Sequence, residues 1–216
     1  MSDPVAILGG TGKEGRGLAA RWSRAGRRVV IGSRDPERAA AAAAEIAALS
    51  GGEVVGAGNA DACAAADVVV LATPFDGLDG LATEHATALA GKLVVSAVIP
   101  LQVVDGRFGT VEIPQGSAAE LAAARLPQSR VATAFHNISY KLLIDLQHPL
   151  DEDVPVAADE EADRALVVEL CRDLGARGVP VGPLSLARYL EGYTAVLLTI
   201  NRLHKTQAGI RFTGLG

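Results

Sequence analysis

One stretch near the start of the chain, residues 5–15, limits the possible folds more than any other. It reads VAILGGTGKEG, an apolar run that ends in glycines and passes directly into a helical pattern. Gly10, Gly12 and Gly15 match G-x-G-x-x-G between an expected strand and an expected helix, where such glycines allow a tight turn, close approach of a pyrophosphate and close helix–strand packing. The stretch therefore predicts a dinucleotide site at the start of a helix. Its residues are Gly10, Thr11, Gly12, Lys13, Glu14 and Gly15.

Strand and helix patterns alternate along the first 150 residues. The expected strands are continuous Val, Ile and Leu runs, at 28–31, 54–55, 67–72, 92–97 and 130–135. The expected helices lie at 36–49, 77–89 and from 117 onward, whereas 101–114 shows no regular pattern. Continuous apolar strands joined by helices are typical of a parallel sheet covered on both faces. The fold class predicted is α/β, with a Rossmann-type doubly wound parallel sheet.

The pattern changes after about residue 150. Short strands are expected at 154–158 and 179–181, with a helix at 160–174 and a long, largely apolar helix at 184–206. We therefore expect a dinucleotide-binding domain over residues 1–150 and a small C-terminal α/β domain over residues 151–216. The last helix is too apolar for full exposure, so it should pack on the first domain or on a second subunit, and it could also cover the cofactor cleft. A homodimer is the expected assembly.

Composition excludes several classes of protein. A net charge of −5 gives no general attraction to nucleic acid or to a membrane surface. The chain has no signal-peptide pattern and no apolar run of the roughly 18 residues that a membrane span needs, so a cytoplasmic protein is expected. Cys63 and Cys171 stand alone and are interpreted as buried thiols. His85, His148 and His204 lack metal-ligand spacing, so no metal site is expected.

The end of the second expected strand indicates which dinucleotide is bound. An acidic residue there binds the ribose 2′-hydroxyl of NAD, whereas an arginine accommodates the 2′-phosphate of NADP. Here the strand ends in Ser33 and Arg34, and Arg38 follows one helical turn later. The Thr11 hydroxyl can add a further hydrogen bond, while Asp35 is better placed as a carboxylate at the start of a helix. The sequence therefore predicts NADP(H).

The residues that follow the other strands should complete the site, because ligands of such sheets bind beyond the carboxyl ends of the strands. They are Thr73 and Pro74, then Ser96, Ala97, Val98 and Ile99, then His136 and Asn137. A mainly apolar pocket with few polar groups suits a flat redox ring stacked on a nicotinamide. His136 is the one titratable group well placed for its centre, as a core histidine or as a hydrogen-bond donor to the accepting ring. It is the candidate catalytic residue.

Seven different short motifs are spread in order over nearly the whole chain. They are GGTG at 9–12, VIGSR at 30–34, VVS at 94–96, AFHN at 134–137, DVPV at 153–156, GPLS at 182–185 and GIRF at 209–212. Together they resemble the NADPH-dependent coenzyme F420 reductases, also called F420:NADP oxidoreductases. The resemblance implies a Rossmann domain and a small C-terminal domain, with the deazaflavin in the cleft between them and stacked on the nicotinamide.

The resemblance also implies an activity, that of an 8-hydroxy-5-deazaflavin:NADP+ oxidoreductase. A hydride would pass between nicotinamide C4 and deazaflavin C5, with NADP(H) as cofactor and coenzyme F420 as co-substrate. Thr11, Ser33, Arg34 and Arg38 would hold the 2′-phosphate, while Val98, Ile99 and the segment around His136 would contact the rings. Two alternatives remain at this point. The protein could reduce another acceptor, such as a flavin, a ferric ion or an imine, or it could be a non-catalytic regulator that senses NADP.

Overall fold

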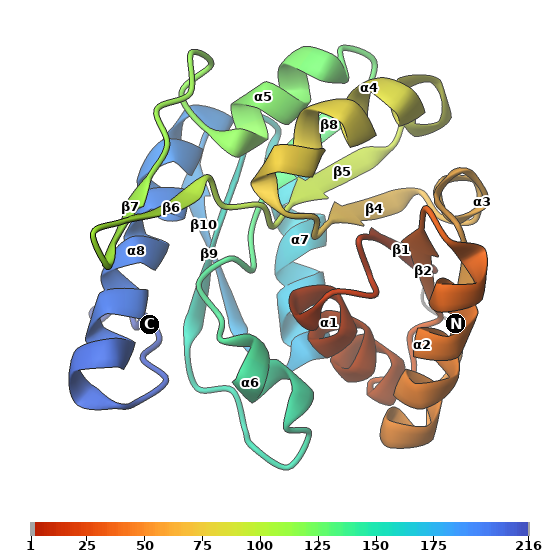
Figure 1. Ribbon diagram of the computed structural model, residues 1–216, viewed down its shortest axis with the longest axis horizontal. Helices are drawn as coiled ribbons and strands as arrows, with labels where there is room; N and C mark the ends of the chain where they lie inside the picture. The colour runs from red at the N-terminus through yellow and green to blue at the C-terminus, as the bar shows by residue number, and fades with distance from the viewer. Residues whose placement is uncertain (1–2, 216) are drawn as a thin grey trace.

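One sheet runs through the whole molecule, which is described here over residues 3–215 by a computed structural model. Its strand order is β10-β9-β8-β5-β4-β1-β2-β3 (Figure 1). The strands are β1 (Val5–Leu8), β2 (Val29–Ser33), β3 (Val54–Gly58), β4 (Val68–Leu71), β5 (Leu93–Ser96), β8 (Arg130–Thr133), β9 (Asp153–Ala158) and β10 (Arg177–Gly182). The six from β3 to β8 are parallel, in the strand order of a Rossmann fold. The predicted fold class is confirmed.

Helices cover both faces of the sheet. On one face, α1 (Lys13–Arg24), α2 (Pro36–Ser50), α6 (Tyr140–Ile144) and α7 (Glu161–Leu174) enclose one apolar core. On the other face, α3 (Asn59–Ala64), α4 (Leu78–Leu89) and α5 (Ala118–Arg125) enclose a second core. Because β1 and β5 lie between the two cores, every residue of both strands is buried, which explains why all of them except Ser96 are apolar.

The end of the sheet opposite β3 departs from a fully parallel arrangement. β9 pairs antiparallel with β8, and β10 runs parallel to β9. The strands of segment 151–216 thus extend the sheet of the first 150 residues. The division into domains at residue 150 stays a prediction, and its outer limits at residues 1–2 and 216 lie outside the described part of the chain.

Two short elements were not expected from the sequence. Segment 101–114 contains a hairpin of β6 (Leu101–Val104) and β7 (Arg107–Thr110), so the prediction of an irregular segment was wrong. The turn is Asp105-Gly106, with φ of 50° and 72°, and an Asp-Gly pair is a strong hairpin signal because it tolerates positive φ. The other unexpected element is the short helix α6.

The C-terminal region ends in a long helix beside the hairpin (Figure 1). After the turn η2 (Leu184–Leu186), α8 (Ala187–His204) runs close to the predicted limits of 184–206. No helix within residues 3–215 is long and apolar enough to span a bilayer. Past α8 the chain turns back toward β9, where the Asp153 carboxylate accepts a hydrogen bond from Phe212 N at 2.6 Å and the Asp153 N–H donates to Ile210 O at 2.7 Å. The segment after α8 is therefore fastened to the sheet.

Candidate functional site

The glycine turn joins β1 to α1, as the sequence predicts. A Cβ atom on Gly15 would lie 2.6 Å from Gly10 Cα, and one on Gly10 would lie 2.6 Å from Ile31 Cβ, so neither position has room for a side chain. Gly12 differs because it borders a cavity, and the nearest atom to an added Cβ is Gly9 O at 3.2 Å. Helix α1 therefore starts at the edge of an open space, as an anion site at a helix N-terminus requires.

A first cavity of about 670 Å³ lies beyond the carboxyl ends of β1, β2 and β4. Seven of the predicted cofactor residues line it: Thr11, Gly12, Ser33, Arg34, Arg38, Thr73 and Pro74. It is large enough for part of a dinucleotide. The structure thus brings together the glycine turn and the residues predicted for the 2′-phosphate.

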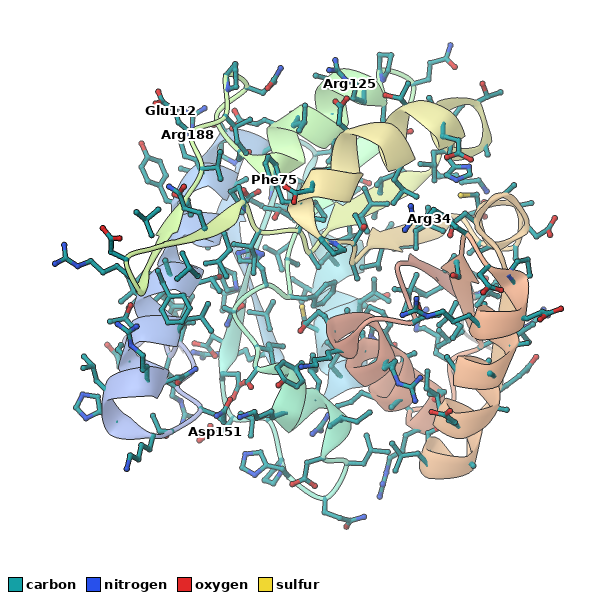
Figure 2. All side chains as sticks on the ribbon, in the orientation of Figure 1. Arg34, Phe75, Glu112, Arg125, Asp151 and Arg188 are labelled. Atoms are coloured by element: carbon teal, nitrogen blue, oxygen red, sulfur yellow. The ribbon has the colours of Figure 1, made fainter. Side chains whose placement is uncertain are left out.

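The side chains at the end of β2 suit a phosphate rather than a ribose hydroxyl. The Asp35 carboxylate accepts hydrogen bonds from Glu37 N and Arg38 N at 3.0 and 3.1 Å, so it caps α2, as expected. Arg34, labelled in Figure 2, and Arg38 form no ion pair with any residue of the described range 3–215. Two arginines without carboxylate partners are therefore available to an anionic ligand.

A second cavity, of about 590 Å³, lies on the other side of the first turn of α1. Four of the predicted residues line it, namely Glu14, Ile99, His136 and Asn137. One wall comes from residues 138–141, and the opposite wall comes from α8 and the segment after it. The residues of that opposite wall are Thr194, Leu197, Leu198, Asn201, Arg202, Lys205, Thr206, Gln207 and Ala208. Helix α8 thus covers this cavity.

The backbone at His136, the first residue of the 136–141 segment that lines the second cavity, is fixed by several contacts. It follows Phe135, which has φ of 73°, a backbone conformation that is costly for a bulky residue. The Phe135 ring packs edge-on against Trp22 at 5.4 Å between ring centroids, and Thr194 Oγ1 donates a hydrogen bond to His136 O at 3.0 Å. Burial lowers the pKa of the imidazole to about 4, so the ring is neutral at physiological pH. A neutral imidazole donates one hydrogen bond and accepts another.

Buried polar atoms without partners gather on this cavity. Within residues 3–215 they include Glu14 Oε1 and Asn137 Oδ1. The two ring nitrogens of His136 also form no hydrogen bond of normal geometry, although backbone groups of Ala134 and Leu190 lie near the ring and favour its charged form. The amide nitrogen of Asn137 does have a partner, since it donates to Asp153 O at 2.9 Å. Because buried polar atoms are nearly always hydrogen-bonded in folded proteins, this cluster indicates a ligand with a polar edge.

The remaining predicted residues line neither of these two cavities. Ser96, Ala97 and Val98 are buried, and Ser96 O accepts hydrogen bonds from Thr133 Oγ1 at 3.1 Å and Ala134 N at 3.2 Å. Gly10 and Gly15 pack within the turn. The Lys13 ammonium lies 5.0 Å from the centroid of the Tyr140 ring. These residues support the walls of the cavities, and direct contact with a cofactor stays a prediction for them.

Several residues on the cavity walls were missed by sequence reasoning. Asn59 borders the first cavity and its side-chain oxygen is buried without a partner among the described residues. Thr194, Asn201 and Gln207 border the second cavity. Isolated polar residues in an apolar helix were the available signal for Thr194 and Asn201, but only tertiary packing determines which face they occupy.

Comparison with known proteins gives consistent matches. A family model described as "NADP oxidoreductase coenzyme F420-dependent" matches residues 4–100. The F420-dependent NADP reductase of Methanothermobacter thermautotrophicus is 37% identical, over 98% of this chain and 95% of that protein. The protein of the same name from Methanocaldococcus jannaschii is 36% identical, over 98% of each.

Comparison with solved structures points to the same family. A protein from Arthrobacter sp. FB24, described in its name as a proposed F420-dependent NADP reductase, superimposes with a TM-score of 0.84. It is 26% identical, and the match covers 98% of this chain and all of that one. From the sequence identity over nearly its full length, the chain belongs to the family of F420-dependent NADP reductases.

Proposed function

We propose that this protein transfers a hydride between NADP(H) and the deazaflavin coenzyme F420. Membership of the family supports this activity, since the relatives are named F420-dependent NADP reductases. The observation that carries the proposal is the pair of cavities that the first turn of α1 borders, with Gly12 on one and Glu14 on the other. Each cavity has the polar groups that one of the two coenzymes requires.

NADP(H) fits the first cavity. Its pyrophosphate would lie at the N-terminus of α1, where backbone N–H groups and the helix dipole favour an anion. The 2′-phosphate would contact Thr11, Ser33, Arg34 and Arg38, because these donors surround the end of β2 and the two arginines lack carboxylate partners among the described residues.

The deazaflavin fits the second cavity. The coenzymes supply the reacting atoms, with a hydride moving between nicotinamide C4 and deazaflavin C5. The protein contributes the apolar surfaces of Ile99, Ile138 and Leu197 for a flat ring, and the unpartnered His136 and Asn137 atoms for its polar edge. A donor such as His136 would stabilise the negative charge that develops on the accepting ring. His136 is therefore proposed as the catalytic residue.

Segment 151–216 is proposed to close the deazaflavin cleft. Its α8 and residues 205–208 form the wall opposite residues 136–141, so the cleft has one side from each part of the chain.

A cytoplasmic location is also proposed. The buried thiols of Cys63 and Cys171 form no disulfide, which agrees with such a location.

A homodimer is proposed as the assembly. Tyr189, Tyr193, Val196 and Leu203 lie exposed along α8, and Val103 and Val104 are exposed on the neighbouring hairpin. Such a patch is typical of a surface covered by another subunit. Light scattering at tens of micromolar, roughly where a standard-sized interface is occupied, should give the mass of a dimer. Tyr193→Asp should shift it toward the monomer, and a monomeric unmutated protein would contradict the proposal.

The activity is tested with purified protein, NADPH and purified F420. Absorbance should show F420 reduction and NADPH oxidation in equal amounts, with F420 a better acceptor than riboflavin, FMN, ferric chelates or a cyclic imine. Deuterium placed at the transferred position of nicotinamide C4 should appear at deazaflavin C5 without loss to water. Oxidation of NADPH by another acceptor but not by F420 would refute the proposed acceptor, and NADP binding without turnover would favour a regulator.

A further inference from the structure

Glu14 lies in an unusual place for a carboxyl group. It is the second residue of α1, and its partly buried side chain borders the second cavity. Its Oε1 atom is buried and has no hydrogen-bond partner among residues 3–215. An ionised carboxylate would be stabilised by a lysine or arginine at this position, and no described residue forms an ion pair with it.

The other titratable and charged groups of the cavity come from every element around it. They are His136 after β8, Tyr140 and Lys141 of α6, Arg202 of α8 and Lys205 after α8. On its own helix, Lys13 lies over the Tyr140 ring and Arg16 pairs with Glu45. The Arg202 guanidinium is hydrogen-bonded to Gly106 O. Lys13, Arg16 and Arg202 thus have other contacts, and Lys141 and Lys205 line the cavity without forming an ion pair with Glu14.

Burial raises the pKa of Glu14 to about 8, so the side chain holds its proton at neutral pH. A protonated carboxyl group donates one hydrogen bond through O–H and accepts through its other oxygen. The neighbouring pyrophosphate site adds a reason to stay neutral, because a second negative charge at the same helix terminus would repel the bound dinucleotide.

Resting on the function proposed above, we infer that Glu14 is a binding residue for the acceptor, whose protonated carboxyl group donates a hydrogen bond to the electron-rich edge of the deazaflavin ring. It shares the cavity with His136 and Asn137, whose unpartnered atoms are suited to the same edge. Loss of its proton would turn this donor into a charge facing ring oxygen and nitrogen atoms, so acceptor affinity should fall at high pH.

The test compares the unmutated protein with Glu14→Gln and Glu14→Leu in titrations of F420 fluorescence from pH 6.5 to 9.5. Glutamine keeps the shape and a donor but cannot ionise. The ratio of the unmutated Kd to the Glu14→Gln Kd should be near 1 at pH 6.5 and should rise about 10-fold by pH 9.5. Ionisation of the coenzyme itself affects both Kd values equally, so its effect cancels in the ratio. Glu14→Leu should bind F420 about 10-fold more weakly than Glu14→Gln at every pH, because a hydrogen bond is lost.

NADP+ binding at pH 6.5 serves as the control for folding and for the first cavity. It should stay within about 2-fold in both variants, since Glu14 borders the other cavity. A Kd ratio that stays near 1 across the pH range, or Glu14→Leu that binds F420 as tightly as Glu14→Gln, would overturn the inference while the proposed function stands. Failure of the unmutated protein to bind F420 at any pH would overturn both.

Discussion

Arg34 and Arg38 form no ion pair with a carboxylate of residues 3–215, although the chain as a whole is acidic. The Asp35 carboxylate caps α2, and Asp35 N donates a hydrogen bond to Ser33 Oγ at 3.1 Å. These contacts fix the local backbone, so both guanidinium groups can turn to the cavity. Selectivity for one phosphate group thus depends on very few side chains.

Arg34→Ala should weaken NADPH binding by about 1.5–3 kcal/mol, the scale of a hydrogen bond to a charged group, and should hardly change NADH binding. Calorimetric titration measures both. Arg125→Ala is a matched control, because Arg125 (Figure 2) is also a partly exposed arginine but pairs with Asp79 at 2.6 Å outside both cavities. Equal affinities of the unmutated protein for NADPH and NADH would contradict the assignment.

His136→Ala should lower turnover with F420 by about 10–100-fold, the effect of losing one polarising donor. NADP+ affinity should persist, since His136 borders the other cavity. Because burial places the pKa of His136 near 4, the ring stays neutral from pH 6 to 9, so its own titration should not appear in the rate profile over that range. Unchanged turnover would assign His136 a packing role only.

The carboxylate of Glu191 on α8 caps the N-terminus of α5 and so connects the two helices. Both Glu191 oxygens accept hydrogen bonds from the start of α5, from Ala118 N at 2.8 Å and Ala119 N at 3.0 Å. Nearby, Arg188 pairs with Glu120 at 2.9 Å. Since α8 forms a wall of the second cavity, these contacts determine where that wall stands.

Glu191→Gln should destabilise the fold by about 1–3 kcal/mol at pH 5, because one buried N–H of α5 loses its acceptor. Burial raises the pKa of Glu191 to about 7, above the ordinary value of 4.5. The folded state therefore holds the proton more tightly than the unfolded state, so the associated stability is present below pH 4.5 and is lost as the pH rises through 7. Urea unfolding should show a smaller advantage of the unmutated protein at pH 8 than at pH 5, and a constant or growing advantage would contradict this.

Regular elements could be predicted where local signals agree. Helix α2 begins at Pro36 behind its Asp35 cap and ends at Ser50, followed by the C-cap Gly51 with φ of 74°, close to the predicted limits. Helix α7 likewise ends before a C-cap glycine, Gly175. The hairpin at 101–110 was missed because its two strands have four residues each and are partly exposed, so they lack the continuous apolar run of the other strands. Helix α6 was missed because four backbone carbonyls of segment 142–148 are held by Arg21, a contact over 120 residues along the chain.

At the scale of the whole molecule, the two cavities differ in how far the sequence predicts them. The first is built around a continuous motif and the next strand end, so residues 9–12 and 33–38 identify it. The second combines α1, the end of β8 and residues 194–208. Long-range packing brings these segments together, so the place of Thr194 and Gln207 on this cavity could not be predicted from the residues near them in the chain.

A chain ending at residue 150 should fail to fold cooperatively. It would leave β8 without β9, and it would remove Leu170 O, which accepts a hydrogen bond from the buried Trp22 Nε1 at 2.9 Å. Circular dichroism during heating should show no sharp transition, and NADP+ should not bind. A fragment that unfolds cooperatively and binds NADP+ like the full chain would establish residues 1–150 as an independent domain.

The pairing of β8 with β9 has a consequence for movement. Two parts of an enzyme joined by a flexible linker can swing together around their ligands, but here a rotation would break the hydrogen bonds of Ala132 and Thr133 with Ala158 and Ala157. The cleft therefore has no hinge in its sheet. If both coenzymes bind as proposed, this pairing would preorganise the spacing of their rings, so turnover should depend little on solvent viscosity. Viscogen titration of the rate measures this.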